Sequence, residues 1–209
     1  MYIQYGCGLS APKEWINFDV SPTLRFQRMP ILGIIFRKII KPKFPKNIKY
    51  GDITKGLPGI QPNSCDGIYC SHVLEHLSLA DFRTAINNTH ILLKPGGIFR
   101  LVMPDFNNLV TSYIDQKNKK NPEACHIFMK NSGMALEHSR RSYKTRLFES
   151  FGNSRHQWLW DKEATIKELE SFGFNDIRQC QFNDSQDPMF KLVEDEDRFR
   201  GSLAIEAKK

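Results

Sequence analysis

The stretch of the chain that decides the fold runs from residue 65 to residue 77 and reads CDGIYCSHVLEHL. Its apolar part, Gly67–Cys70, predicts a buried strand, because a short apolar run next to polar turn residues is typical of one. A helix is expected directly afterwards, with His72, Glu75 and His76 in its first turn. Ligands of wound α/β sheets bind at the carboxyl ends of the strands, so we expect the functional site at this junction.

Similar apolar segments along the rest of the chain predict the other strands of an α/β sheet. No repeat and no Pro-, Gly- or Ser-rich linker divides the chain, so residues 1–209 are expected to form a single domain. The expected strands are Tyr2–Tyr5, Trp15–Asp19, Lys49–Ile53, Ile98–Met103, Phe174–Phe182 and Ser202–Ala207. The expected helices run from Ser78 or Asp81 to Ile91, from Asn107 to Gln116 and from Asp161 to Phe172.

The composition is that of an ordinary globular protein, with 40% hydrophobic and 25% charged residues. No apolar run reaches the roughly 18 residues that a membrane-spanning helix needs. The given sequence starts almost at once with an expected strand, so we expect no signal peptide. The five cysteines are scattered and lack zinc-ligand spacing, so we expect reduced thiols in a cytoplasmic protein.

The positive charge is concentrated in one insert, residues 21–50. The chain carries a net charge of +7, and eight basic and no acidic residues lie in this insert, so the remainder is close to neutral. Between Pro30 and Pro42, apolar and basic residues alternate with helical periodicity, which predicts an amphipathic helix.

Two interpretations of this insert stay open. The helix could cover a face of the sheet, or it could bind an anionic membrane or a lipid-linked substrate and hold the protein at the inner membrane face. Nucleic-acid binding is the least favoured interpretation, because few aromatic side chains are available to stack on bases.

The glycines of the segment after the first expected strand indicate a cofactor loop. Gly6 and Gly8, followed by Ala11, match a loose dinucleotide fingerprint. The acidic residue that would bind the ribose, Asp19, follows Gly8 too closely for a full helix, and Pro12 lies between them. A pyrophosphate needs the N-terminus of that helix, so the loop favours a cofactor with a ribose and no phosphate. S-adenosylmethionine is such a cofactor.

Six motifs follow one another along the chain: Gly6-x-Gly8, Asp19 at the end of strand two, Gly51-Asp52-Ile53, Ser71–Leu77, Leu93–Gly97 and Val102–Asp105. In this order they give the chain a resemblance to the class I S-adenosylmethionine-dependent methyltransferases, in particular the type 11 methyltransferase-domain group. The resemblance implies a Rossmann-like, doubly wound sheet of seven strands in the order 3-2-1-4-5-7-6, with the last strand antiparallel. The basic insert, which follows strand 2, and residues 117–153 lie outside the resemblance. Because residues 117–153 are polar and weakly periodic, we expect residues 107–153 to cover the substrate.

The resemblance also implies roles for particular residues in binding S-adenosylmethionine. Asp19 would accept hydrogen bonds from the ribose hydroxyls, and Asp52 would accept one from the adenine amino group. The other residues implied to line the cofactor are Gly6, Gly8, Ile53, Ser71 and His72.

Three residues are candidates for a catalytic base, which an oxygen acceptor would need. His72 is expected at the carboxyl end of strand four, although it could simply line the cofactor. Asp105 follows strand five, where an aspartate is also an ordinary helix cap. His156 precedes Trp158 and Trp160, which could form an apolar wall for the acceptor or belong to the core.

His72, Glu75 and His76 also match H-x-x-E-H, an inverted zinc-protease motif. No other motif supports proteolysis, so we expect no metal. Glu75 and His76 are interpreted as residues that hold the turn in position.

The sequence therefore predicts a methyltransferase whose acceptor is a small molecule, a sugar or a lipid-linked saccharide, methylated at oxygen. The Asn/Asp-Pro-Pro-Tyr/Phe motif of many enzymes that methylate nucleobase or glutamine nitrogen is missing, since Cys70-Ser71-His72-Val73 stands in its place. The alternatives are an RNA methyltransferase that uses the basic insert and a related protein that binds without turnover. The sequence does not predict the oligomeric state.

Overall fold

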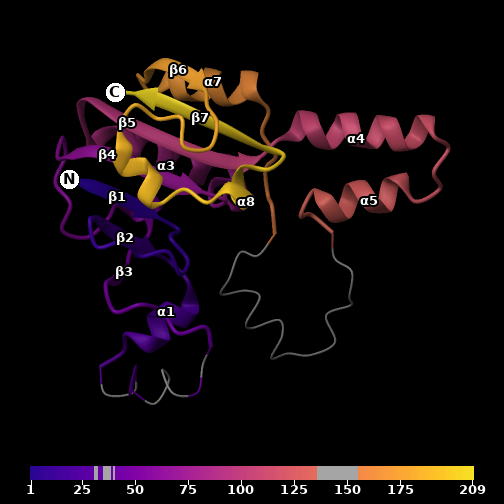
Figure 1. Cartoon of the computed structure of the whole chain (residues 1–209). Coiled ribbons are helices and arrows are strands. Elements are labelled where there is room, and N and C mark those ends of the chain that lie inside the picture. Colours follow the sequence, from indigo (N-terminus) through magenta and orange to yellow (C-terminus); the bar gives the residue numbers. More distant parts are fainter. Residues whose placement is uncertain (31–32, 35–38, 40, 136–154) are drawn as a thin grey trace.

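The computed structural model describes residues 1–30, 33–34, 39, 41–135 and 155–209, and within these ranges the chain forms a seven-stranded sheet (Figure 1). The strand order is β3-β2-β1-β4-β5-β7-β6, as predicted. Strands β1 to β5 pair in parallel, whereas β7 runs antiparallel to both β5 and β6. The strands are β1 Tyr2–Tyr5, β2 Trp15–Asp19, β3 Ile48–Tyr50, β4 Cys65–Ser71, β5 Leu93–Pro104, β6 Asn175–Gln179 and β7 Ser202–Lys208.

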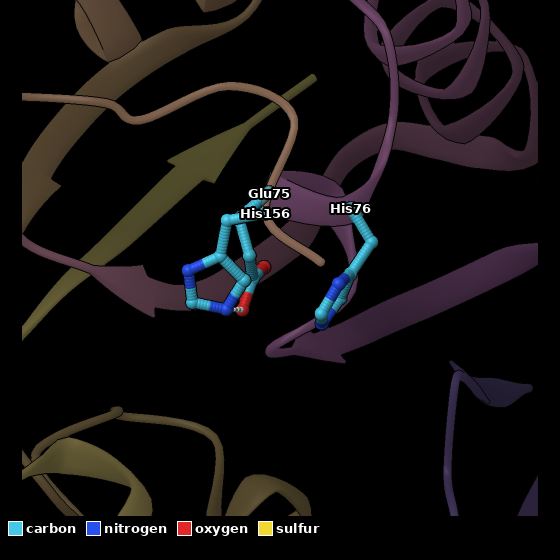
Figure 2. Close-up of side chains that lie close together, drawn as sticks. All are labelled: Glu75, His76 and His156. Carbon is cyan, nitrogen blue, oxygen red and sulfur yellow. Dashed lines mark ion pairs between the residues drawn. The ribbon is translucent and has the colours of Figure 1, made fainter. Parts of the chain in front are cut away.

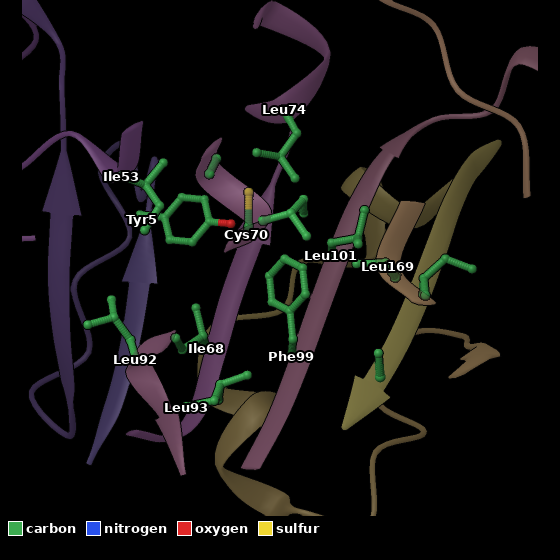
Figure 3. Packing of buried hydrophobic residues seen from close by; sticks show 14 of the residues in the cluster. Tyr5, Ile53, Ile68, Cys70, Leu74, Leu92, Leu93, Phe99, Leu101 and Leu169 are labelled. Carbon is green, nitrogen blue, oxygen red and sulfur yellow. The ribbon is translucent and has the colours of Figure 1, made fainter. Parts of the chain in front are cut away.

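One face of the sheet carries the main hydrophobic core. Because successive residues of a strand point to opposite faces, Ile68 and Cys70 of β4 point to the same side as Phe99 and Leu101 of β5 (Figure 3). The helices α3 (Leu79–Leu92) and α7 (Lys162–Ser171) contribute buried residues to this core. Both helices are capped at the N-terminus by side chains, those of Ser78 and Asp161.

The opposite face carries several polar residues and is covered by a different part of the chain. Gln4, Tyr69 and Arg100 are all buried there. The segment 188–199, which contains η3 (Pro188–Leu192) and α8 (Glu196–Phe199), packs on this face: Phe190 is fully buried, with its ring centroid 5.4 Å from that of Trp15.

The acidic sequence of residues 185–199 predicts only a connecting loop, and this prediction is wrong because the segment covers a face of the sheet. The apolar side chains at Phe190 and Val193 allow this segment to replace the helix that the short connection after β1 leaves out. The basic insert does not cover this face with its described residues. Its helix α1 (Pro22–Gln27) buries Leu24 against Phe44 and Ile48 near β3. Most of the amphipathic helix expected between Pro30 and Pro42 lies outside the described residues.

Helices α4 (Phe106–Asn118) and α5 (Ala124–Asn131) form a pair that projects beyond the sheet (Figure 1). The rings of Tyr113 and Phe128 contact each other between the two helices, with centroids 5.6 Å apart. No residue of α4 is buried. The remainder of the predicted cover region, residues 136–153, lies outside the described part.

Across the described ranges, no helix has the length and apolar character required to span a membrane.

Candidate functional site

A cavity of about 520 Å³ lies at the carboxyl ends of β1 and β4. The loop after β1 and the end of β4 form one wall, and the segment 192–198 forms the other. This volume lies within the range of small-molecule sites. The lining residues are Gln4, Tyr5, Gly6, Cys7, Leu9, Ser10, Tyr69, Ser71, Leu192, Val193, Glu194, Asp195 and Arg198.

Two buried hydroxyl groups of the lining have no hydrogen-bond partner within the described part of the chain. They are the hydroxyls of Tyr69 and Ser71. Buried polar groups of folded proteins are nearly always hydrogen-bonded, so these two groups fit a polar ligand in the cavity. The amino-acid end of S-adenosylmethionine, which Ser71 was predicted to line, carries both donors and acceptors.

The loop after β1 is held by buried polar side chains in place of a helix. Gln4 Nε2 donates hydrogen bonds to Asn17 Oδ1 at 2.6 Å and to the Ser10 carbonyl at 3.1 Å. Gly6 has a φ of +66°, and a Cβ atom there would clash with Val73. The glycine is therefore required for the close approach of this loop to the turn after β4.

Asp19 fixes the same loop to the end of β2. Its Oδ2 accepts a hydrogen bond from the Gly8 amide at 2.9 Å, and its Oδ1 accepts one from the Ser21 amide at 2.7 Å. Burial raises the pKa of Asp19 above its usual value, and the two amide hydrogen bonds only partly oppose this rise. A carboxylate has about four acceptor sites. Asp19 can therefore accept further hydrogen bonds from a ribose, and that role stays a prediction.

The residues predicted for the adenine end lie outside the cavity lining. Asp52 Oδ1 accepts hydrogen bonds from the amide of Thr54 at 3.0 Å and from its hydroxyl at 2.7 Å, and thus caps η1 (Ile53–Lys55). The side chain of Ile53 is 5% exposed and packs in the main core. The contact of Ile53 with the adenine ring stays a prediction.

The turn after β4 differs from the helix that was expected there. His72 has a φ of 52°, which is uncommon for a residue with a side chain. The short helix η2 (Leu74–His76) follows, and α3 starts only at Leu79. Left-handed residues of this kind cluster at functional sites, where the surrounding structure holds them.

The ring of His72 is held on both sides. Its Nε2 is 2.9 Å from the Arg198 carbonyl oxygen, and its Nδ1 is 3.2 Å from Glu75 Oε1. Burial alone would lower the pKa of His72, but the interactions with Glu75 and the Arg198 carbonyl outweigh it and raise the pKa above its usual value.

His156 lies beside the same carboxylate, although it is distant in the sequence. Its Nε2 is 3.9 Å from Glu75 Oε1, and its Nδ1 donates a hydrogen bond to the Ser132 carbonyl at 2.7 Å. The ring of His76 contacts that of His156 edge to face, with centroids 4.9 Å apart (Figure 2). The structure thus brings a ring nitrogen of His72 and one of His156 close to the same carboxylate, that of Glu75. The Glu75 side chain is 1% exposed.

Asp105, the third predicted catalytic residue, caps α4. Its Oδ1 accepts a hydrogen bond from the Asn107 amide at 2.9 Å, and its backbone forms a bridge with Trp160. Trp160 is buried and stacks on Phe82 at 4.0 Å, so it belongs to the core, whereas Trp158 is 42% exposed.

The sequence did not reveal the residues of the second cavity wall. Glu194 is held in this wall by Arg100, whose Nε donates to Glu194 Oε1 at 2.6 Å. Arg100 is fully buried in the middle of β5 and also contacts Asp184 and Glu206. An arginine within an otherwise apolar strand indicates a buried ion-pair network, and this feature could have been found in the sequence.

Comparisons with known proteins agree with this geometry. Residues 34–101 match the family model described as "methyltransferase domain". A solved S-adenosylmethionine-dependent methyltransferase from Archaeoglobus fulgidus matches 100% of this chain and 85% of its own, with 18% identity and a TM-score of 0.51. The DszA carbon methyltransferase matches 100% of this chain and 46% of its own, with 15% identity and a TM-score of 0.50. No curated protein sequence matches the chain.

These two structural matches show the fold, and the family match indicates the methyl donor. S-adenosylmethionine is the methyl donor of this family, and the orphan hydroxyls of the cavity fit such a polar ligand. Residues 34–101 therefore match a methyltransferase-domain family, and the chain has the Rossmann-like fold of the S-adenosylmethionine-dependent methyltransferases.

Proposed function

We propose that this methyltransferase transfers the methyl group to a hydroxyl oxygen of a small molecule, a sugar or a lipid-linked saccharide. The main observation behind the proposal is that imidazole groups lie around the buried Glu75 carboxylate. Glu75 belongs to the turn that follows Ser71, a residue of the cavity lining. His72 and His156 both reach this carboxylate, from two distant parts of the sequence.

The chemistry explains why such a group indicates an oxygen acceptor. Methyl transfer breaks the bond between the sulfonium sulfur and the methyl carbon, and the acceptor atom forms the new bond. The cofactor supplies the activated methyl group, so the protein mainly orients the reactants. A hydroxyl group must also lose its proton, and a positioned base accelerates this by about 10²–10⁴-fold. Imidazole and carboxylate groups can accept that proton.

The basic insert supports an acceptor presented at an anionic lipid surface. Lys41, Lys43, Lys46 and Lys49 are exposed, and Ile34 and Ile39 expose 69% and 72% of their surface. Exposed apolar side chains beside lysines are typical of interfacial segments. Vesicles that contain anionic lipid should retain the wild type and not the Ile39→Glu variant. Equal retention of both would contradict this part of the proposal.

RNA methylation is the competing function. Two of the eight basic residues of the insert are already engaged: Arg28 donates to the Pro45 and Ile48 carbonyls, and Arg25 lies over the Tyr50 ring. An RNA enzyme should bind RNA with a steep salt dependence that decreases when the lysines at 41–49 are neutralised. Tight RNA binding of that kind would favour the alternative.

The direct test joins cofactor binding to an acceptor screen. Calorimetry should show binding of S-adenosylmethionine to the wild type and to the surface control Asp176→Ala. The Asp19→Ala variant should bind at least about tenfold more weakly, because it loses a charge-assisted acceptor worth about 1.5–3 kcal/mol. Labelled methyl groups should then be transferred to hydroxyl-bearing acceptors. Transfer only to nitrogen would overturn the oxygen assignment, and binding without any turnover would favour a binding protein.

A further inference from the structure

We propose that Glu75, His76 and His156 form a binding site for a divalent transition-metal ion. One potential ligand atom from each residue lies within 4.8 Å of the other two (Figure 2). Glu75 and His76 come from η2, and His156 comes from the segment that leads to β6 through α7. The fold thus brings two distant parts of the chain together around one point.

The Glu75 carboxylate is the first observation that indicates a ligand. Its side chain is 1% exposed, and neither oxygen has a hydrogen-bond partner within the described part of the chain. His72 Nδ1 is 3.2 Å from Oε1, but without the alignment of a hydrogen bond. A buried carboxylate is costly unless it is paired, hydrogen-bonded or bound to a metal. A cation at this point would supply a partner besides the imidazoles of His72 and His156.

The hydrogen bonds of the two histidines are the second observation. Nδ1 of His156 donates to the Ser132 carbonyl at 2.7 Å, and Nδ1 of His76 is 3.1 Å from the Arg155 carbonyl. Because a carbonyl oxygen can only accept, each Nδ1 carries the proton and Nε2 of the neutral ring carries the lone pair. Metal-binding histidines characteristically donate their other ring N–H to a carbonyl or carboxylate in this way.

The cluster is also held rigidly. The Gly133 carbonyl accepts a hydrogen bond from the His156 amide at 3.2 Å. Because Gly133 has no side chain, the His156 ring can pack directly against it. The Gln157 amide donates to the Glu75 carbonyl at 2.7 Å. Fixed ligand positions of this kind lower the cost of assembling a metal site.

The donor set selects the kind of ion. Two imidazoles and one carboxylate suit Zn²⁺ and related transition metals, whereas Mg²⁺ and Ca²⁺ prefer oxygen ligands. Ligand atoms of a tetrahedral site with metal–nitrogen bonds of about 2.1 Å lie about 3.4 Å apart. His156 Nε2 and Glu75 Oε1 are 3.9 Å apart, so small side-chain rotations would close the group around an ion. Three protein ligands leave a coordination position open for an exogenous group.

In this proposal, the acceptor hydroxyl would bind at the open position. The cluster follows Ser71 of the cavity lining directly in the turn after β4, and His72 joins it to the second cavity wall. An oxygen bound to a divalent metal loses its proton more readily. This catalytic role rests on the proposed methylation of oxygen, whereas the binding of the metal does not.

The test measures metal binding to the full chain without cofactor or acceptor. After treatment with a chelator, the protein is titrated with Zn²⁺, Mn²⁺ and Mg²⁺ by calorimetry, and its melting temperature is recorded with and without Zn²⁺. The wild type should bind one Zn²⁺ per chain and melt at a higher temperature with it. His156→Ala and Glu75→Gln should each bind Zn²⁺ at least about tenfold more weakly and lose the shift in melting temperature.

Two features of the design keep the result clear. The exposed His126 on α5 provides a matched control, and His126→Ala should bind Zn²⁺ as the wild type does. Glu75→Gln keeps the shape of the side chain and removes a buried charge whose only partners in the described part of the chain are the imidazoles of His72 and His156, so its fold should survive. Equal Zn²⁺ affinity of the wild type and both cluster variants, or binding of Mg²⁺ alone, would overturn the site. That outcome would not affect the proposed methylation of oxygen. Conversely, a product methylated at nitrogen would overturn the methylation of oxygen and would not affect the metal site.

Discussion

His72 Nε2 lies 2.9 Å from the carbonyl oxygen of Arg198 and donates a hydrogen bond to it. This contact joins the turn after β4 to the segment 188–199, and so connects the two walls of the cavity. The guanidinium group of Arg198 lines the cavity, where its Nη1 is 3.4 Å from the Ser71 carbonyl.

Replacement of Arg198 by alanine should weaken the binding of S-adenosylmethionine. The variant removes a cation from the cavity, which would otherwise face the carboxylate of the cofactor. Charged hydrogen bonds are worth about 1.5–3 kcal/mol, so we expect a loss of affinity of about tenfold to a hundredfold by calorimetry. Arg200→Ala is the control, because its side chain is 71% exposed and pairs only with Glu196 and Asp197 among the described residues. Unchanged affinity in Arg198→Ala would contradict this role.

Replacement of Arg100 by leucine should destabilise the fold strongly. Arg100 contacts Asp184, Glu194 and Glu206, and the variant would leave these carboxylates without their buried partner. Removal of one member of a buried ion pair costs about 3–5 kcal/mol, which urea unfolding would measure.

The matched control for this variant is Arg83→Leu. Arg83 forms a surface pair with Glu168, and its side chain is 49% exposed. Surface pairs contribute about 0–1 kcal/mol, so this variant should unfold at nearly the same urea concentration as the wild type. Equal losses in the two variants would contradict the buried network.

The stability of the protein should decrease in acid through the same network. Burial tends to raise the pKa of Asp184 and Glu206, but hydrogen bonds and charge from Arg178 and Arg100 outweigh it and lower both pKa values. A lowered pKa in the folded state adds stability above the unfolded-state pKa of about 4, and this contribution is lost as the pH falls. Glu194, whose pKa is raised by burial, partly offsets the loss.

The Arg178→Ala variant tests this explanation. Arg178 pairs with both carboxylates, so the variant should show a shallower decrease of the urea midpoint between about pH 6 and about pH 3 than the wild type does. Parallel pH profiles would show that the acid sensitivity arises elsewhere.

The Gly133→Ala variant should separate backbone strain from displacement of His156. Gly133 has a φ of +69°, and a Cβ atom there would collide with the His156 ring. Gly96 has a φ of +76° with nothing near its Cβ position, so Gly96→Ala carries the strain alone. Both variants should lose about 1–2 kcal/mol of stability. Only Gly133→Ala should also lose Zn²⁺ affinity and methyl transfer, which calorimetry and a labelled-methyl assay would detect.

The sequence predicted those parts of the fold that short-range patterns determine. Tyr2–Tyr5 and Trp15–Asp19 were predicted with their observed bounds, because Gly6 ends the first strand and the loop containing Pro12 precedes the second. The expected third strand was longer than β3, since Asp52 caps a short helix instead of ending a strand.

The sequence could not predict what depends on tertiary contacts. The positive φ of His72 is imposed by its surroundings and breaks the expected helix, although no local pattern indicates it. Gly6 and Ser71 line the cavity, and their contact with the cofactor stays a prediction. The second wall at 192–198 depends on the packing of Phe190 against Arg100 on the same face of the sheet, which no local pattern indicates. The proximity of His156 to Glu75 likewise follows from the packing of distant segments, so the motif at His72–His76 alone did not predict a metal.

The position of the segment 188–199 in the chain has a consequence for synthesis on the ribosome. Strands β1 to β5 emerge first, and for a time the polar face of their sheet, with Trp15 and Tyr69, has no cover. The cavity has only one wall until this late segment arrives. The nascent chain is therefore expected to acquire its cofactor only after the segment 188–199 has been made, and to need protection from aggregation until then.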